Sequence, residues 1–142
     1  MNKEHYSYEQ LTKDMKILAE KVRPYNFEVI VPITRGGLVP ACHLGYLLNI
    51  RNFQALCMSS YDGHEQTQLD IISVPDLKDI PREKVLVVDS MVDRGTTLMK
   101  TKELLGEVKF LTIHLKPHTI IMPNFYLQTT SKWIVYPWDY ED

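Results

Sequence analysis

The pattern of apolar and polar positions in the first half of the chain predicts two helices and two strands. Residues 8–22 carry apolar side chains at helical spacing among charged ones, and Pro24 follows as a stop, which predicts an amphipathic helix. The β-branched run EVIVPIT at residues 28–34 is typical of a strand buried on both faces. A second helix is expected over residues 38–49 and a second strand over residues 53–61.

The second half repeats this alternation after a polar connection. Residues 62–70 are rich in turn formers, and the proline-containing stretch beyond them indicates a short ribbon and a connector. KVLVVD at residues 84–89 has the strongest strand pattern, residues 96–106 predict a helix, and residues 109–116 predict another buried strand. This alternation indicates an α/β fold, in which an open, twisted, mainly parallel sheet is flanked by helices.

Length and composition are compatible with one domain over residues 1–142. The 16 basic and 18 acidic residues leave a net charge of -2, which favours neither nucleic acid nor a membrane surface as a partner. A cytoplasmic protein is expected, because the sequence has no membrane-length apolar run and no secretion signal at its start. Cys42 and Cys57 lack metal-ligand spacing and are expected to be reduced thiols without a function.

Three charged residues follow predicted strands, namely Arg35, Asp89 and Lys116. Ligands of open parallel sheets bind at the carboxyl ends of the strands. We therefore expect these three side chains to lie near one another.

The segment VLVVDSMVDRGTTL at residues 85–98 combines a strand, an acidic loop and a helix start. Amides at a helix start bind phosphate, and the glycine and threonines here allow close approach and add donors. Arg94 adds a charge, Asp89 would accept hydrogen bonds from ribose hydroxyls, and Asp93 would face the group at the anomeric carbon. The alternative is an ordinary turn in which Asp93 and Thr96 only cap the helix.

The same segment resembles the 5-phosphoribosyl-1-pyrophosphate (PRPP) signature of type I phosphoribosyltransferases. That signature has two adjacent acids after the strand, whereas this chain has Asp89 followed by Ser90, and it has Arg94 in place of a small hydroxyl residue. The resemblance implies that Asp89 contacts the ribose, that Asp93 is the catalytic acid or base for a purine ring nitrogen, and that residues 93–97 hold the 5-phosphate. The PRPP-binding residues implied in this loop are Asp89, Ser90, Asp93, Arg94, Gly95, Thr96 and Thr97.

Magnesium is the cofactor that this resemblance implies. The hydroxyl of Ser90 is a poor magnesium ligand compared with a carboxylate, which leaves Asp89 as the metal ligand expected from this loop. Magnesium held by pyrophosphate, ribose oxygens and water needs few protein ligands, and Ser90 can still bond to the ribose.

The string VPITRGGLVPA resembles the pyrophosphate loop of bacterial xanthine-guanine phosphoribosyltransferases. Arg35, Gly36 and Gly37 would then bind PRPP, because two glycines permit unusual backbone geometry and a guanidinium offers a fork of donors. Taken alone, RGG is equally well explained as a glycine turn with a solvated arginine.

The segment SSYD resembles the start of the mobile loop that closes over the site in the family, which implicates Ser60, Tyr61 and Asp62. Beyond them the resemblance weakens, because a basic residue that related enzymes often carry is missing. His64 could supply that charge when protonated, although a solvated loop histidine is the simpler interpretation.

HLKP and KWIVYPWD resemble the base-binding segments of the same enzymes. Lys116 would donate to the 6-carbonyl of a purine, Trp133 would stack on its ring, and the backbone of Ile134 would contact its 2-position. Asp139 is expected to shape this pocket, and His114 to be a packed strand histidine. Without this context, the tryptophans would be taken for core or interface residues.

Together these motifs imply the type I phosphoribosyltransferase fold, with a small hood of C-terminal and N-terminal segments over the site. The implied reaction transfers 5-phosphoribosyl from PRPP to guanine, xanthine or hypoxanthine, which the sequence does not rank, and the implied assembly is a homodimer or homotetramer. A non-catalytic regulator that binds PRPP or a nucleotide is the alternative. An adenine or pyrimidine enzyme conflicts with Lys116 and the Trp133 pocket, since adenine has no 6-carbonyl.

Overall fold

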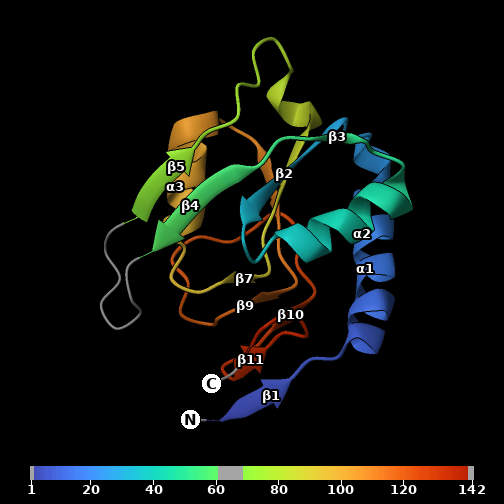
Figure 1. Cartoon of the computed structure of the whole chain (residues 1–142), viewed down its shortest axis with the longest axis vertical. Helices are drawn as coiled ribbons and strands as arrows, with labels where there is room; N and C mark the ends of the chain where they lie inside the picture. Colours follow the sequence, from blue (N-terminus) through green and yellow to red (C-terminus); the bar gives the residue numbers. More distant parts are fainter. Residues whose placement is uncertain (1, 61–68, 141–142) are drawn as a thin grey trace.

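The computed structural model describes residues 2–60 and 69–140, and its central element is a mainly parallel sheet (Figure 1). Within this part of the chain the sheet has the order β5-β4-β2-β6-β8, and β3 pairs with the start of β2. Only β5 is antiparallel to its neighbour, so the expected mainly parallel sheet is confirmed. The strands of this sheet are β2 Val29–Thr34, β3 Asn52–Phe53, β4 Leu56–Ser60, β5 Leu69–Ser73, β6 Val85–Val88 and β8 Lys109–Leu111.

The sheet is buried on both faces because its central strands are continuously apolar. Leu86 and Val88 of β6 pack in the core that α1 and α2 cover. Val85 and Val87 pack in a second core, which α3 covers on the other face (Figure 1). This alternation fixes the orientation of β6, since a shift of one residue would exchange the two sets. The helices are α1 Tyr8–Val22, α2 Leu38–Leu48 and α3 Thr96–Leu105.

The three helices agree with the expected ones, and their ends have local causes. At the start of α1, the side chain of Ser7 accepts a hydrogen bond from the amide of Gln10. α2 and α3 end at Asn49 and Gly106, which both have positive φ, as is common at helix C-termini. None of the helices in the described residues is long and apolar enough to cross a membrane.

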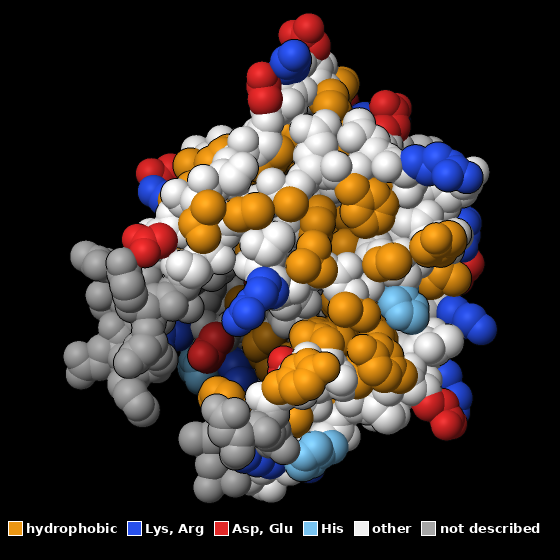
Figure 2. Space-filling model, viewed as in Figure 1, with side chains coloured by type: hydrophobic (Ala, Val, Ile, Leu, Met, Phe, Trp, Pro, Cys, Tyr) orange, Lys and Arg blue, Asp and Glu red, His pale blue; other side chains and the backbone are white. Residues whose placement is uncertain are grey.

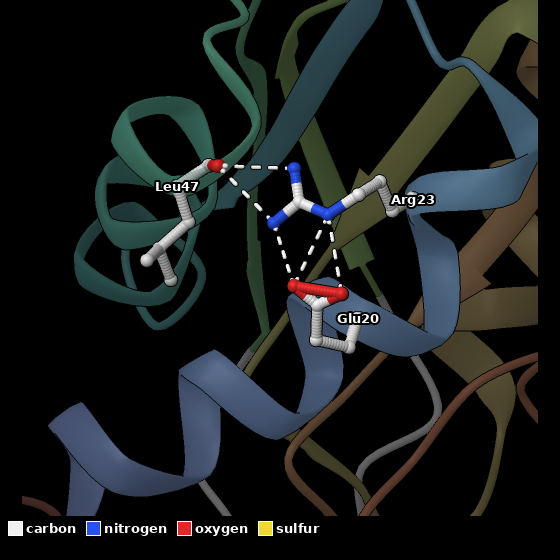
Figure 3. A network of polar contacts seen from close by, with 3 residues as sticks. All are labelled: Glu20, Arg23 and Leu47. Carbon is white, nitrogen blue, oxygen red and sulfur yellow. Dashed lines mark hydrogen bonds and ion pairs between the residues drawn. The ribbon is translucent and has the colours of Figure 1, made fainter.

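An arginine holds α1 against α2, as Figure 3 shows. Arg23 follows α1 and binds the carboxylate of Glu20, with its Nη2 atom 2.9 Å from Oε1. The same guanidinium donates to the carbonyl of Leu47 in the last turn of α2. A cation is favourable there, because the last carbonyls of a helix lack partners within it.

Two expected strands are interrupted. The strand expected at residues 53–61 is split into β3 and β4, which pair with opposite ends of β2. The strand expected at residues 109–116 breaks after β8, and its second part belongs to another sheet, of order β10-β9-β7. Both parts are buried, so apolar periodicity does not reveal the change of sheet. The strands of the second sheet are β7 Met91–Val92, β9 His114–Leu115 and β10 Gln128–Thr129.

The hood consists of the N-terminal strand paired with a C-terminal one. β1 (Lys3–His5) runs parallel to β11 (Trp133–Val135), which confirms the expected hood, although β1 itself was not predicted. Lys132 and Glu4 form an ion pair of 3.1 Å beside this ladder. The amide of Tyr6 donates to the carbonyl of Val135 at 2.9 Å and extends the pairing.

A buried polar network attaches the hood to the second sheet. The hydroxyl of Tyr136 donates to the carbonyl of Ser90 at 3.1 Å and lies 2.9 Å from Nδ1 of His114. Since Ser90 takes the hydroxyl proton, Nδ1 of His114 must carry hydrogen and donate to Tyr136. Burial lowers the pKa of His114 and raises that of Tyr136, so both stay neutral near pH 7. His114 is therefore the packed histidine that was expected.

Outside the hood, apolar side chains gather on the face that carries α2 (Figure 2). Tyr46 is 87% exposed there, and Leu38 at the start of the helix is also exposed. Tyr46 lies outside the segments that were expected to bind a ligand, whereas Leu38 belongs to the string VPITRGGLVPA and directly follows the glycines.

Replacing Tyr136 with phenylalanine should destabilise the protein by about 1 to 3 kcal/mol, because the Nδ1 proton of His114 would be buried without an acceptor. Urea unfolding measures the change. Tyr140→Phe is the matched control, since Tyr140 is 99% exposed and should leave the unfolding free energy unchanged. Equal stability of both variants would contradict the network.

Candidate functional site

Two loops meet at the carboxyl ends of the central strands. One follows β2 at residues 35–37, and the other follows β6 at residues 89–95. A Cβ atom on Gly36 would lie 2.9 Å from Oγ of Ser90, and one on Gly37 would lie 2.2 Å from the carbonyl oxygen of Val88. At position 37 only glycine fits, because the contacts are with backbone atoms, whereas a side chain at position 36 would require the hydroxyl of Ser90 to move. The peptide bond that precedes Arg35 is cis.

One hollow opens between these loops, and a second lies beside it along the loop after β6 and the start of α3. The first has a volume of about 200 Å³ and the second of about 90 Å³, and they share Asp89 and Thr97 as lining residues. The second is otherwise lined mainly by residues 91–98. The first is lined by Ile33, Thr34, Gly36, Met58, Ser59, Leu69, Asp89 and Thr97. The site is therefore elongated and passes the carboxyl of Asp89.

The Asp89 carboxyl is poorly solvated. Burial raises the pKa of Asp89 to about 7, against the opposing effect of a 2.7 Å hydrogen bond from the amide of Ser90. Among the described residues no cation pairs with it. A carboxyl in this position is partly ionised near neutral pH, so hydroxyl donors or a cation in the hollow would favour its charged form.

Helix α3 begins without a side-chain cap. Its N-cap residue is Gly95, with φ of 98°, and no side chain bonds to the first amides of the helix. The alternative in which Asp93 and Thr96 only cap the helix is therefore wrong. Residues 93–97 at this helix start line the smaller hollow, and uncapped amides at the start of a helix can bind an anion.

Asp93 instead makes a contact that the sequence analysis missed. Its Oδ1 atom lies 2.6 Å from Nε2 of His118, and the two side chains are 65% and 61% exposed. His118 comes two residues after Lys116, which was expected to bind the base. This closeness in sequence was the one signal that His118 could belong to the site. The contact joins residues 25 positions apart, and local spacing does not predict it.

Lys116 and Trp133, which are expected to recognise a base, belong to segments that contact each other. Lys116 follows β9, and its ammonium donates to the carbonyl of Lys132, the residue before Trp133. Trp133 is 53% exposed, so a large part of its ring is accessible for stacking. Lys116 also lies beside the loop after β6, because its amide donates to the carbonyl of Val92 at 2.9 Å.

The other two residues expected at the base have roles in the hood. Ile134 is buried and pairs with Glu4 across the two-stranded ladder. The carboxylate of Asp139 accepts a hydrogen bond of 2.9 Å from the amide of Tyr136 and stabilises the turn between them. Trp138 stacks on Tyr136 with 4.8 Å between the ring centroids. Asp139 thus shapes the end of the hood.

The remaining expected residues differ in how much the structure says of them. Arg35 and Arg94 are exposed, and neither guanidinium bonds to another described residue, so both are available to an anion. Ser60 ends β4. Tyr61 and Asp62, which begin the expected mobile loop, lie outside the described residues.

The described residues offer few side-chain ligands to a metal ion. Within residues 2–60 and 69–140, no three histidine, cysteine or acidic side chains come together as ligands. Ser90 is buried, and its hydroxyl lies against Gly36. These residues fit a metal ion that takes most of its ligands from a bound polyanion and water, and one from the carboxylate of Asp89.

Comparison with known proteins agrees with this geometry. Residues 7–142 match the family model of the phosphoribosyl transferase domain. A xanthine-guanine phosphoribosyltransferase of Chromohalobacter salexigens is 34% identical over 137 residues, which cover 94% of this chain and 82% of that protein.

Solved structures show the same likeness. A purine phosphoribosyltransferase from Pyrococcus horikoshii has a TM-score of 0.86 and 34% identity, over 100% of this chain and 97% of its own. The Helicobacter pylori xanthine-guanine-hypoxanthine phosphoribosyltransferase has a TM-score of 0.82 and 28% identity, over 96% and 93%. Since the family model covers residues 7–142 and these relatives match along nearly the whole chain, the chain belongs to the phosphoribosyltransferase family.

Proposed function

We propose that the protein transfers a 5-phosphoribosyl group from PRPP to a 6-oxopurine and releases pyrophosphate. The observation that carries this proposal is the pair of adjoining hollows that share Asp89 and Thr97, one at the uncapped start of α3 and the other reaching Gly36 of the loop after β2. Relatives named as xanthine-guanine and purine phosphoribosyltransferases support a purine as the acceptor. Guanine, xanthine and hypoxanthine are the candidate bases.

The sugar half of the site binds three chemical groups. The amides at the start of α3 and the hydroxyls of Thr96 and Thr97 hold the 5-phosphate. Asp89 accepts hydrogen bonds from the ribose hydroxyls. Arg35 and the two glycines that follow it bind the pyrophosphate, whose negative charge grows as it leaves C1 of the ribose.

The base half fixes the ring and accepts its proton. Lys116 donates to the 6-carbonyl, Trp133 stacks on the ring, and the backbone of Ile134 lies near the 2-position. Asp93 accepts the proton of the ring nitrogen as the glycosidic bond forms. Adenine is a poor substrate in this arrangement, because it presents no carbonyl to Lys116.

Magnesium is the proposed cofactor, and when bound it neutralises charge on the pyrophosphate. Asp89 is the residue of this chain that would hold it, because its carboxyl is poorly solvated and lacks a cationic partner among the described residues. Ser90 contributes a hydroxyl to the ribose side of the site. A cytoplasmic homodimer or homotetramer remains a prediction, and light scattering tests the assembly.

The second candidate is a regulator that binds PRPP or a nucleotide without catalysis. It is favoured by Ser90, which leaves one carboxylate where the family signature has two. An absorbance assay with PRPP, magnesium and each base in turn separates the two candidates. Nucleotide formation with a 6-oxopurine supports the enzyme, whereas calorimetric binding of PRPP without any product supports the regulator.

Asp89→Asn should stabilise the ligand-free protein at pH 8 while it weakens PRPP binding. The raised pKa means that the folded protein binds a proton more tightly than the unfolded chain, so stability falls as pH rises from about 4 to about 7. The rise in the pKa of Asp89 corresponds to a loss of at most about 4 kcal/mol in the free energy of unfolding between low and high pH. Asparagine does not ionise, so the variant does not lose this stability.

Thermal unfolding of both proteins at pH 4 and pH 8 measures this effect. The difference in melting temperature between variant and wild type should be small at pH 4 and large at pH 8, and calorimetry should show weaker PRPP binding by the variant. A difference in melting temperature that does not depend on pH would contradict the raised pKa of Asp89.

Trp133→Ala should raise the KM for the base about 5- to 150-fold, because stacking contributes about 1 to 3 kcal/mol. The KM for PRPP should change little, since the indole lies in the hood and not in the phosphate loop. Trp133→Phe keeps a ring and is the matched control. A large effect on PRPP alone would argue against stacking on the base.

A further inference from the structure

The segment after β9 is attached to the phosphate loop on both sides of Asp93. The amide of Lys116 donates to the carbonyl of Val92 at 2.9 Å, and the amide of Ile120 donates to the carbonyl of Arg94 at 3.1 Å. The first bond continues the parallel pairing of β7 with β9 beyond the ends of the strands, and the second joins the loop to a residue four positions farther along the segment. Asp93 is the residue between the two carbonyls, so its backbone is held from the same neighbouring segment.

His118 lies midway along that segment and reaches the Asp93 side chain. Its Nε2 atom is 2.6 Å from Oδ1 of the carboxylate. The following turn is closed by the hydroxyl of Thr119, which donates to the carbonyl of Ile121 at 2.8 Å. Ile121 packs so closely on Gly95 that a Cβ atom there would lie 2.5 Å from its Cγ2 atom. The imidazole is therefore carried by a framework built onto the phosphate loop.

The direction of the bond follows from the chemistry of the two groups. An ionised carboxylate has no hydrogen to donate, so Nε2 of His118 carries the hydrogen and donates it to Asp93. The bond occupies Oδ1 and leaves Oδ2 for another donor. Asp93 is exposed, and such a side chain samples several rotamers unless a neighbour holds it, which lowers the fraction of molecules in which the carboxylate is correctly placed for a ligand.

We propose that His118 is a positioning residue for Asp93, which it holds so that Oδ2 faces the protonated ring nitrogen of the purine. This inference rests on the proposed phosphoribosyl transfer. In that step a ring nitrogen bonds to C1 of the ribose, and the bond from C1 to the pyrophosphate oxygen breaks with its electron pair on pyrophosphate. The ring proton moves to Asp93. His118 donates its hydrogen bond throughout and neither gains nor loses a proton.

The test compares two substitutions that differ in one property. Glutamine can place an amide nitrogen near the position of Nε2, so His118→Gln keeps a donor but cannot act as an acid or base. His118→Ala removes the donor. We expect kcat to fall about 10- to 100-fold in the alanine variant and to stay within about three-fold of wild type in the glutamine variant. The KM for PRPP should change less than about two-fold in both.

Met122→Ala is the control, because Met122 belongs to the same connection, is exposed and has no part in the site. Unchanged kcat in His118→Ala would overturn the proposal. An equal loss in His118→Gln and His118→Ala would overturn it too, because the imidazole itself would then be required.

A measurement without turnover separates this proposal from the proposed function. In protein labelled with ¹⁵N-histidine, the His118 shifts should report hydrogen on Nε2 in the wild type, and Asp93→Ala should change them. Failure of the wild type to form nucleotide would reject the transferase activity, while these shifts would still test the contact. Shifts that do not respond to Asp93→Ala would reject the positioning role.

Discussion

The close approach of the loops after β2 and β6 is the constraint on which the rest of the site depends. The two strands pair in parallel from Val29 opposite Val85 to Pro32 opposite Val88, so their following residues emerge side by side. Glycine at position 37 lets the backbone lie against a strand carbonyl, and Gly36 does the same against the start of the second loop. A side chain at position 37 would collide with the backbone of β2 and β6, and one at position 36 would collide with the side chains of Ser90 and Asp89. The poor solvation of that carboxyl is therefore a product of backbone packing.

This packing leaves two sets of polar groups incompletely paired within the described residues. The first amides of α3 have no side-chain cap, and Asp89 has no cation beside it. Each would be stabilised by a ligand that brings an anion to the helix and hydroxyl donors to the carboxyl. A core buried on both faces of the sheet offsets the cost of keeping them unpaired. The groups that are unfavourable in the free protein are thus those assigned to the phosphosugar.

The backbone carbonyl of Ser90 connects three parts of the structure. It accepts hydrogen bonds from the amides of Ile113 and His114 and from the hydroxyl of Tyr136, so it joins the loop after β6, the second sheet and the hood. Trp133 comes three residues before Tyr136 on the same segment. The position of the hood segment that carries Trp133 relative to the loop after β6 is therefore set by buried hydrogen bonds, whose loss would affect both segments together.

The sequence by itself determined the elements and the chemistry of the loops. Periodicity located the three helices and the central strands because it reports which side chains are buried, and the Asp89 and RGG motifs marked the loops that the fold brings together. Only the tertiary structure decided the break after β8, the pairing of β1 with β11, and the contact between Asp93 and His118. These depend on which buried segments become neighbours, and local patterns do not specify a partner that is distant in the chain.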